Sequence, residues 1–139
     1  MKTDFRPPLP DILSDMQQLL GSLKEMMLAE QQQLISAHPD SYRLQNLAED
    51  KQAALNTLDY LDKQRMNAGT AAGLQAPYLR ESALHARWQQ IHLRVTELQQ
   101  MNQHTALLLQ QQMDRTAQAL TLLHPLQTQA LYGPDGQGR

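Results

Sequence analysis

The side chains that could carry chemistry in this sequence are five histidines, His38, His85, His92, His104 and His124. A zinc site built on one helix needs two ligands about a turn apart, so that both face the same ion. His85 and His92 lie seven residues apart and His104 lies twelve further on, so no two histidines share a turn. The spacing does not support a metal site, and we expect neither a metal nor any other cofactor.

His104 raises a second possibility, a histidine phosphotransfer bundle. In such a bundle an exposed helical histidine accepts a phosphoryl group, whose charge nearby cations hold. The neighbouring residues Gln103, Thr105 and Ala106 supply no cation. Phosphotransfer through His104 therefore stays open only as a distant alternative.

Other kinds of enzyme find little support in the residues. No Gly-rich phosphate loop precedes an expected helix, and no paired carboxylates lie in an apolar stretch that would raise the pKa of one of them. The absence of cysteine excludes thiol catalysis and zinc ribbons. A net charge of −2 with scattered basic residues disfavours nucleic acid as the main partner. We expect a protein that is not an enzyme.

The elements that position these side chains are expected to be helices. The sequence has 25 Leu and 21 Gln but one Phe, one Trp and four Tyr, which favours an all-α fold. Its 139 residues suit a single helical domain spanning 1–139. Neither a signal peptide nor an apolar run long enough to span a membrane is present, so we expect a cytoplasmic protein without membrane insertion.

The longest periodic stretch predicts a helix over about 77–124. Its apolar ladder, in steps of four and three, is Leu84, Trp88, Ile91, Val95, Leu98, Asn102, Thr105, Leu109, Gln112, Thr116, Ala119 and Leu123. Trp88 is expected to be a core or groove aromatic. We place Pro77 in the first turn of this helix, end the helix at His124-Pro125, and expect an irregular tail over 125–139.

Two shorter ladders predict helices over about 11–37 and 40–66, with Asp40 or Ser41 as the N-cap of the second. The few residues between them force an antiparallel hairpin. The Gly- and Ala-rich residues 67–76 carry no period and are expected to form a flexible loop.

These lengths predict an antiparallel three-helix bundle, or coiled coil, in which the long third helix overhangs a helical hairpin. It would run beside the hairpin only to about Gln103–Ala106. The remainder is rich in leucine, and no Lys, Arg, Asp or Glu occurs between Glu97 and Asp114. An apolar overhang of this kind is typical of a partner-binding surface. Four positions of the ladder here are polar: Asn102, Thr105, Gln112 and Thr116. They could set the register of the helix against its neighbours, but we favour the interpretation that this stretch of the helix is not buried.

Several short segments, taken in order over about residues 11–137, resemble the FlgN-type flagellar type III export chaperones. They are Glu30–Leu34, Leu58–Leu61 with Gln64-Arg65, Arg87–Gln89, Met101–His104, Gln118–Leu120, and Leu131–Gly133 with Asp135–Gln137. None is diagnostic alone, since Gln-rich helices are common. Their joint order makes the resemblance specific.

The resemblance implies a helical chaperone that binds the C-terminal segments of the hook-filament junction proteins FlgK and FlgL. It would prevent their premature assembly and deliver them to the export gate. It places the substrate on Leu107, Leu108, Leu109, Met113, Thr116, Leu120 and Leu123, and contact with the cytoplasmic domain of the gate protein FlhA on Leu131, Tyr132 and Gly133. The alternative is a generic coiled-coil scaffold that homo-oligomerises through the long helix. The residues leave the oligomeric state open.

Overall fold

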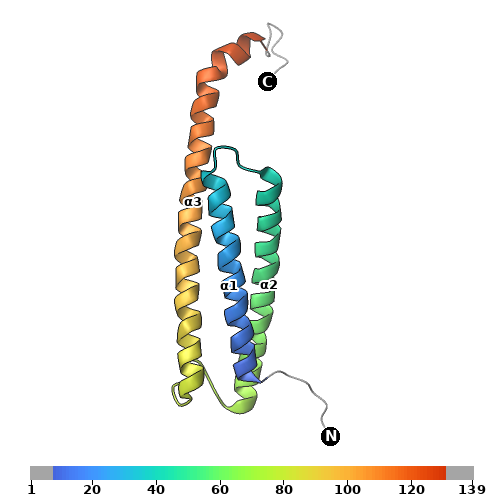
Figure 1. The fold of residues 1–139 in the computed structure, drawn as a ribbon, viewed down its shortest axis with the longest axis vertical. Helices are drawn as coiled ribbons and strands as arrows, with labels where there is room; N and C mark the ends of the chain where they lie inside the picture. Colours follow the sequence, from blue (N-terminus) through green and yellow to red (C-terminus); the bar gives the residue numbers. More distant parts are fainter. Residues whose placement is uncertain (1–7, 131–139) are drawn as a thin grey trace.

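The protein is an array of three long helices, described by a computed structural model over residues 8–130, with side chains described as far as Leu123. Helix α1 spans Leu9–Ile35, α2 spans Ser41–Ala72 and α3 spans Ser82–Ala130. Figure 1 shows α1 between the other two, with α3 extending well beyond the hairpin. The expected all-α fold with an overhanging third helix is confirmed.

Helix α1 is the most deeply buried element because it packs against both of the others. Pro8 precedes it and Pro10 lies in its first turn, where a missing N–H costs nothing. Two sets of side chains, each in steps of seven, are buried along it: Leu9, Met16, Leu23 and Glu30 in one, and Leu13, Leu20, Met27 and Leu34 in the other. A helix with two buried stripes is expected when neighbours cover two of its sides.

A short connection turns the chain back after α1. Asp40 caps α2: its Oδ1 accepts hydrogen bonds from the backbone N–H groups of Tyr42 at 3.0 Å and Arg43 at 3.2 Å. Such a cap stabilises a helix by about 1 kcal/mol. Of the two candidate N-caps, Asp40 is therefore the one that caps α2. The short connection makes α1 and α2 an antiparallel hairpin.

The expected loop over 67–76 is wrong for residues 67–72, which belong to α2, while residues 73–76 lie in the connection to α3. Gly73 ends it in the left-handed conformation with φ of 71°, and the N–H of Leu74 donates to the carbonyl of Gly69 at 2.7 Å. A Cβ on Gly69 would lie only 2.6 Å from the carbonyl oxygen of Leu74. The two glycines thus permit a Schellman cap, and the connection to α3 begins at Gly73.

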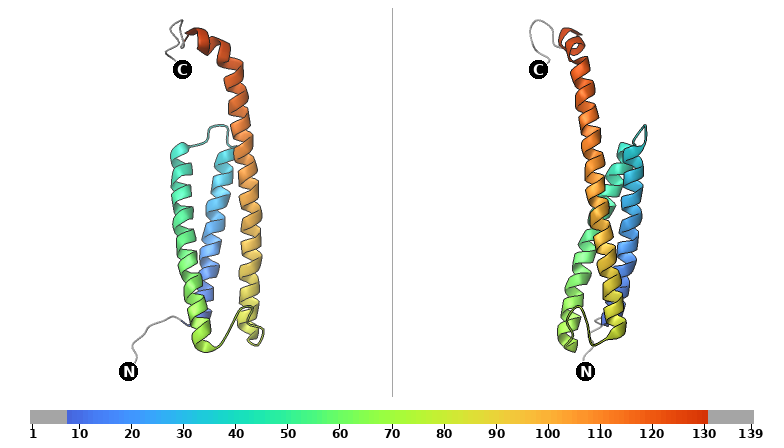
Figure 2. Two further views of the ribbon diagram at one scale, coloured as in Figure 1. Left: turned by 180° about the vertical axis from the view of Figure 1, so that it is seen from behind. Right: turned by 90° about the vertical axis from the view of Figure 1, so that its left-hand side faces the viewer.

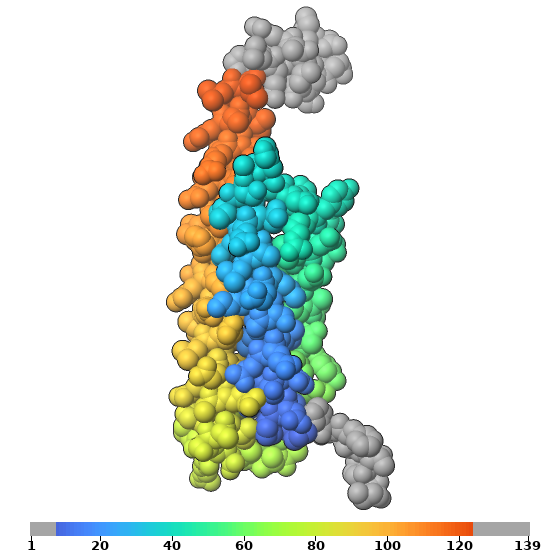
Figure 3. Space-filling view, in the orientation of Figure 1, coloured from blue at the N-terminus to red at the C-terminus, as the bar shows by residue number. Residues whose placement is uncertain are grey.

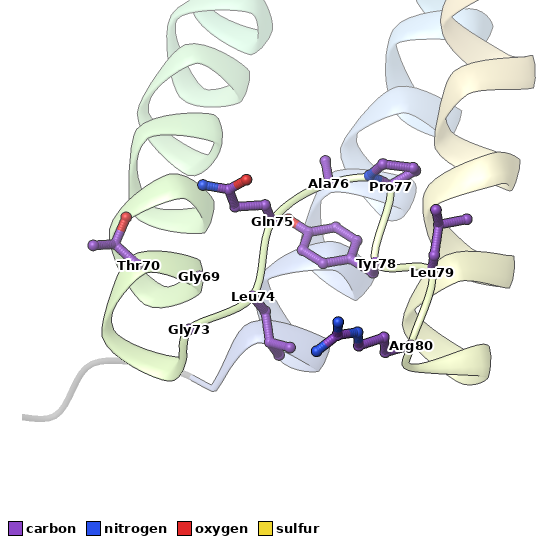
Figure 4. A pocket seen from close by; sticks show the side chains of 10 residues that line it. All are labelled: Gly69, Thr70, Gly73, Leu74, Gln75, Ala76, Pro77, Tyr78, Leu79 and Arg80. Atoms are coloured by element: carbon purple, nitrogen blue, oxygen red, sulfur yellow. The ribbon is translucent and has the colours of Figure 1, made fainter.

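The expected position of Pro77 in the first turn of α3 is also wrong. The helix begins at Ser82, five residues later, and Pro77 lies in the connection after a cis peptide bond. Tyr78 follows with a positive φ of 59°, which a helix cannot contain, and its side chain is buried. Figure 4 shows the ring of Tyr78 within this connection, between the end of α2 and the start of α3.

An aromatic cluster joins α2, the connection and α3 near this end of the molecule. The guanidinium of Arg65 lies 4.4 Å from the centre of the Trp88 ring and donates to the hydroxyl of Tyr78 at 2.8 Å. The Tyr78 and Trp88 rings pack edge to face at 5.8 Å. Burial opposes the charge of Arg65, but hydrogen bonds to Asp62 and Tyr78 outweigh it and raise its pKa. Arg65 therefore stays charged and fixes α3 against α2.

Polar contacts hold α3 in register with α1. Lys24 Nζ lies 2.7 Å from a carboxylate oxygen of Glu97. This hydrogen bond from Lys24 is the main cause of a lowered pKa at Glu97. Further along, Gln31 Nε2 donates to the carbonyl of Met101 at 3.0 Å and to Oγ1 of Thr105 at 3.2 Å. These bonds specify which residues of α3 face which residues of α1.

The expected end of α3 at residue 124 is wrong as well, since the helix continues to Ala130. Residues 125–130, which we expected in an irregular tail, are helical. Proline removes one hydrogen bond and crowds the preceding turn, which bends a helix when the chain continues through it. Figure 1 shows that α3 bends over its last turns, in the region that contains Pro125.

Candidate functional site

The ionisable residues do not assemble into a reactive centre. Within residues 8–123, whose side chains are described, no three His, Asp or Glu side chains gather where they could hold a metal ion. A hollow of about 470 Å³ lies beneath the connection between α2 and α3 (Figure 4), lined by Gly69, Thr70 and Gly73–Arg80. That lining contains no carboxylate and no histidine, so it offers no acid–base pair. The candidate site is a binding surface.

The overhang of α3 begins after Gln112. The side-chain amide of Gln112 donates to the carbonyl of Leu34, in the last turn of α1, at 2.6 Å. Beyond this bond α3 projects past the hairpin as a single helix (Figures 1 and 3). The contact with α1 thus extends about six residues further than expected, because α3 starts at Ser82 instead of near Pro77.

Five of the predicted substrate-binding residues share one side of this helix. Leu109, Met113, Thr116, Leu120 and Leu123 follow one another in steps of four and three, and all are exposed. We call these five residues the distal stripe. Three of the four large apolar side chains in it lie beyond Gln112, where α1 no longer covers α3.

The other two predicted residues do not belong to the distal stripe. Leu107 lies two residues before Leu109 and therefore points to the opposite side of α3, although it is exposed. Leu108 is half-buried. No single side of α3 therefore carries all seven of the residues expected to bind substrate.

The interpretation of the polar ladder positions as unburied is wrong for two of the four. Thr105 is buried and accepts the hydrogen bond from Gln31, while Gln112 is half-buried and bonded to Leu34. These two residues set the register of α3 against α1, which was the other interpretation of the polar ladder positions. Asn102 and Thr116 are exposed, as expected.

A second surface lies between α2 and α3, and sequence reasoning missed it. Among the described residues, Cα atoms of α1 approach those of both α2 and α3 within 8 Å, whereas α2 and α3 do not approach each other. Two hollows of about 340 and 230 Å³ lie in the space this leaves. We call it the inter-helix groove; α1 forms its floor with Met16, Leu20, Leu23 and Met27, and its walls include Leu55 and Leu58 of α2 and Trp88, Val95 and Asn102 of α3.

Figure 2, left, shows the molecule from the side on which the groove opens, with α1 behind the space between α2 and α3. The only residue whose predicted role allowed for a groove was Trp88, which was expected to be an aromatic side chain of either the core or a groove. Leu55 of α2 lines both hollows.

The three residues assigned to the export gate lie outside the described part of the chain. Leu131, Tyr132 and Gly133 follow the last described residue of α3. A separate observation concerns membranes: none of the three helices, over the residues described, combines the length and apolarity that a bilayer span requires.

Comparisons with known proteins agree on one family. The family model described as FlgN protein matches residues 8–139. The flagella synthesis protein FlgN of Yersinia enterocolitica is 41% identical over 122 residues, covering 88% of this chain and 83% of that protein. FlgN of Salmonella typhimurium is 40% identical, over 93% and 89% of the two chains, and FlgN of Proteus mirabilis is 32% identical, over 100% and 92%. No solved structure matches the chain.

Proposed function

We propose, from the premise that this chain belongs to the FlgN family of flagella synthesis proteins, that it is a flagellar type III export chaperone. Its cargo is the C-terminal segments of the hook-filament junction proteins FlgK and FlgL. It binds them in the cytoplasm, prevents their premature assembly and carries them to the export gate. The role requires binding and release and no catalysis.

The observation that carries this proposal is the distal stripe, an exposed apolar surface on a helix that projects beyond its own bundle. Large exposed apolar surfaces mark sites that a partner covers. An amphipathic helix laid along the distal stripe would hide its own apolar face and that of the chaperone together. Proteins that polymerise through apolar terminal helices need such cover until export.

The energetics favour a complex that forms and also dissociates. Each large apolar side chain that becomes buried contributes roughly 1.5 to 3 kcal/mol. Ordering a disordered cargo segment costs about 2 to 5 kcal/mol or more, and association itself has a further cost. The four large apolar residues of the distal stripe contribute about 6 to 12 kcal/mol before these costs, so the net affinity is moderate at most. Moderate affinity suits a cargo that must be released at the gate.

Titration calorimetry of the purified chain against the C-terminal segment of FlgK or FlgL tests the proposal. We expect saturable binding with one cargo segment per chain. The matched control is a peptide of the same composition in which the spacing of three and four is scrambled. Absence of binding by both junction proteins at about 100 µM would refute the chaperone role.

We also propose that Leu131, Tyr132 and Gly133 contact the cytoplasmic domain of FlhA. Aromatic anchors often dominate such interfaces, and truncating one typically costs about 2 kcal/mol or more, roughly a thirtyfold loss of affinity. Tyr132→Ala should therefore weaken binding to FlhA and reduce export, while cargo binding is unchanged. Tyr42→Ala, at an exposed tyrosine of α2, is the control. Equal export by both variants would contradict the assignment.

A further inference from the structure

The two hollows of the inter-helix groove repeat with the period of a coiled coil. Every residue of α3 that lines the larger hollow has a counterpart seven positions later that lines the smaller one. These pairs include Trp88 and Val95, Ile91 and Leu98, and Val95 and Asn102. The lining residues of α1 follow the same rule, with Leu23 seven positions after Met16. The hollows therefore lie roughly 10 Å apart, the length of one heptad of a helix.

The floor of the groove is already covered, so an occupant would reach into it with side chains. The floor residues on α1 are at most 4% exposed, and Leu58 and Val95 of the walls pack against the same core cluster. Leu55, beside both hollows, is 44% exposed. Side chains spaced seven residues apart on a fourth helix would enter the two hollows as knobs enter the holes of a coiled coil. The groove thus fits an amphipathic helix with an apolar heptad pattern.

The wall that α3 contributes to the groove continues into the distal stripe. Further steps of seven from Asn102 and from Gln99 reach all five residues of the distal stripe and otherwise only Ala106. No Lys, Arg, Asp or Glu occurs at any position of these two rows from Trp88 to Leu123. The groove wall and the distal stripe are therefore one surface of roughly 53 Å along a single helix.

The two ends of the groove differ. At the end near the connection, the guanidinium of Arg65 on α2 lies over the ring of Trp88 on α3, and Tyr78 packs against the same ring. These side chains bridge the two walls. At the other end the groove leads onto the overhang of α3, beyond the hairpin (Figure 2, left). A helix lying in the groove therefore ends near Trp88 and continues past the overhang.

We propose that the cargo segment binds as one amphipathic helix along this whole surface, antiparallel to α3, with its last turns in the inter-helix groove. This inference rests on the proposed function, in which the cargo segment is the C-terminal end of its chain. The chain end then lies beside Trp88, and the folded part of the cargo stays beyond the overhang, where no hairpin obstructs it. The segment would need about 35 residues in helical heptads.

The chain carries its own reporter of the groove, because Trp88 is its only tryptophan. Two cargo segments without tryptophan are compared: the last 35 or so residues of FlgK or FlgL, and the same segment without its final 15 or so, roughly the length from Trp88 to Asn102. Calorimetry should show binding of both, with the full segment about tenfold tighter or more. Only the full segment should shift the emission of Trp88 to shorter wavelength and protect it from acrylamide quenching.

The direction of the cargo helix is tested with the same reporter. A nitroxide label quenches tryptophan emission at short range. Attached to the last residue of the full segment, the label should quench Trp88, whereas on the first residue it should have no effect. Quenching from the first residue alone would show a parallel helix and overturn the proposed direction.

Substitution of Leu55 tests the wall formed by α2. Leu55→Glu should weaken binding of the full segment by about tenfold and change that of the shortened segment by less than about twofold. The matched control is Tyr60→Glu, at a residue of α2 that is 58% exposed and lines neither hollow. It should bind both segments normally. If Leu55→Glu proves unstable by circular dichroism, the emission of Trp88 in the unmodified chain decides.

The outcomes separate this inference from the proposed function. Equal affinities for the two segments with unchanged emission of Trp88 would overturn binding in the groove and leave the chaperone role intact. Absence of binding by both segments would overturn both. A change in Trp88 emission on concentrating the chain without cargo would assign the groove to a second copy of the chain and also overturn the inference.

Discussion

Replacing Leu120 and Leu123 together by aspartate is expected to abolish cargo binding and to leave the helical content nearly unchanged. These side chains are 51% and 48% exposed and lie beyond Gln112, whose side chain donates a hydrogen bond to the last turn of α1. Losing two apolar anchors costs about 3 to 6 kcal/mol of binding energy, a loss of roughly a hundredfold or more in affinity. Titration calorimetry measures the affinity and circular dichroism the helicity.

The same chemical change on the opposite side of α3 provides the control. Leu107 and Leu122 are also exposed, and Leu122 is 81% exposed, but neither falls on the distal stripe. Leu107→Asp with Leu122→Asp should therefore retain cargo binding. If both double variants lose binding equally, general apolarity and not the stripe would be responsible. A large drop in the melting temperature of the first double variant would instead identify its positions as core.

Helical periodicity was the most informative property of the sequence. Leu84, Ile91 and Leu98 were expected on a buried ladder and are buried against α1. A spacing of three and four places side chains on one side of a helix whatever covers it, so the ladder is readable without knowing its partner. Comparing helix lengths then predicted the overhang, because an unmatched length of helix must project beyond its neighbours.

Helix ends were harder to predict because the same residue can serve two structures. Gly69 and Gly73 indicate flexibility when read alone, but four residues apart they permit the left-handed cap and the close backbone approach that end α2. A proline such as Pro125 usually ends a helix, yet α3 continues through it to Ala130. The error at the end of α2, with Pro77 placed in the first turn of α3, put the predicted start of α3 five residues too early, and this displaced the predicted limit of its contact with α1.

The inter-helix groove could not be predicted from periodicity at all. A ladder shows that one side of a helix is apolar, but it does not show which helices are neighbours and which lie across a diagonal. Val95 and Gln99 would have the same spacing in a closed three-helix bundle, where α2 would cover them. Only the arrangement of the helices reveals that these residues line an open groove.

Leu13→Ala is expected to cause a large loss of stability. Leu13 is 0% exposed and belongs to the core cluster on α1, the helix that both neighbours require. Removing a buried leucine side chain loses its transfer energy and leaves a cavity, at a cost of about 2 to 5 kcal/mol. For a chain of this size the melting temperature should fall by about 10 °C. Urea denaturation followed by circular dichroism measures the loss directly.

Leu93→Ala is the matched control, because Leu93 is exposed on α3 and should change stability by less than about 0.5 kcal/mol. Equal losses for the two variants would contradict the central position of α1. Below its lowered melting temperature, Leu13→Ala should still bind cargo with nearly normal affinity, since the distal stripe is untouched. The double aspartate variant should show the reverse, with normal stability and no binding. Opposite effects from the two sets of substitutions would distinguish the residues that stabilise the bundle from the residues that bind cargo.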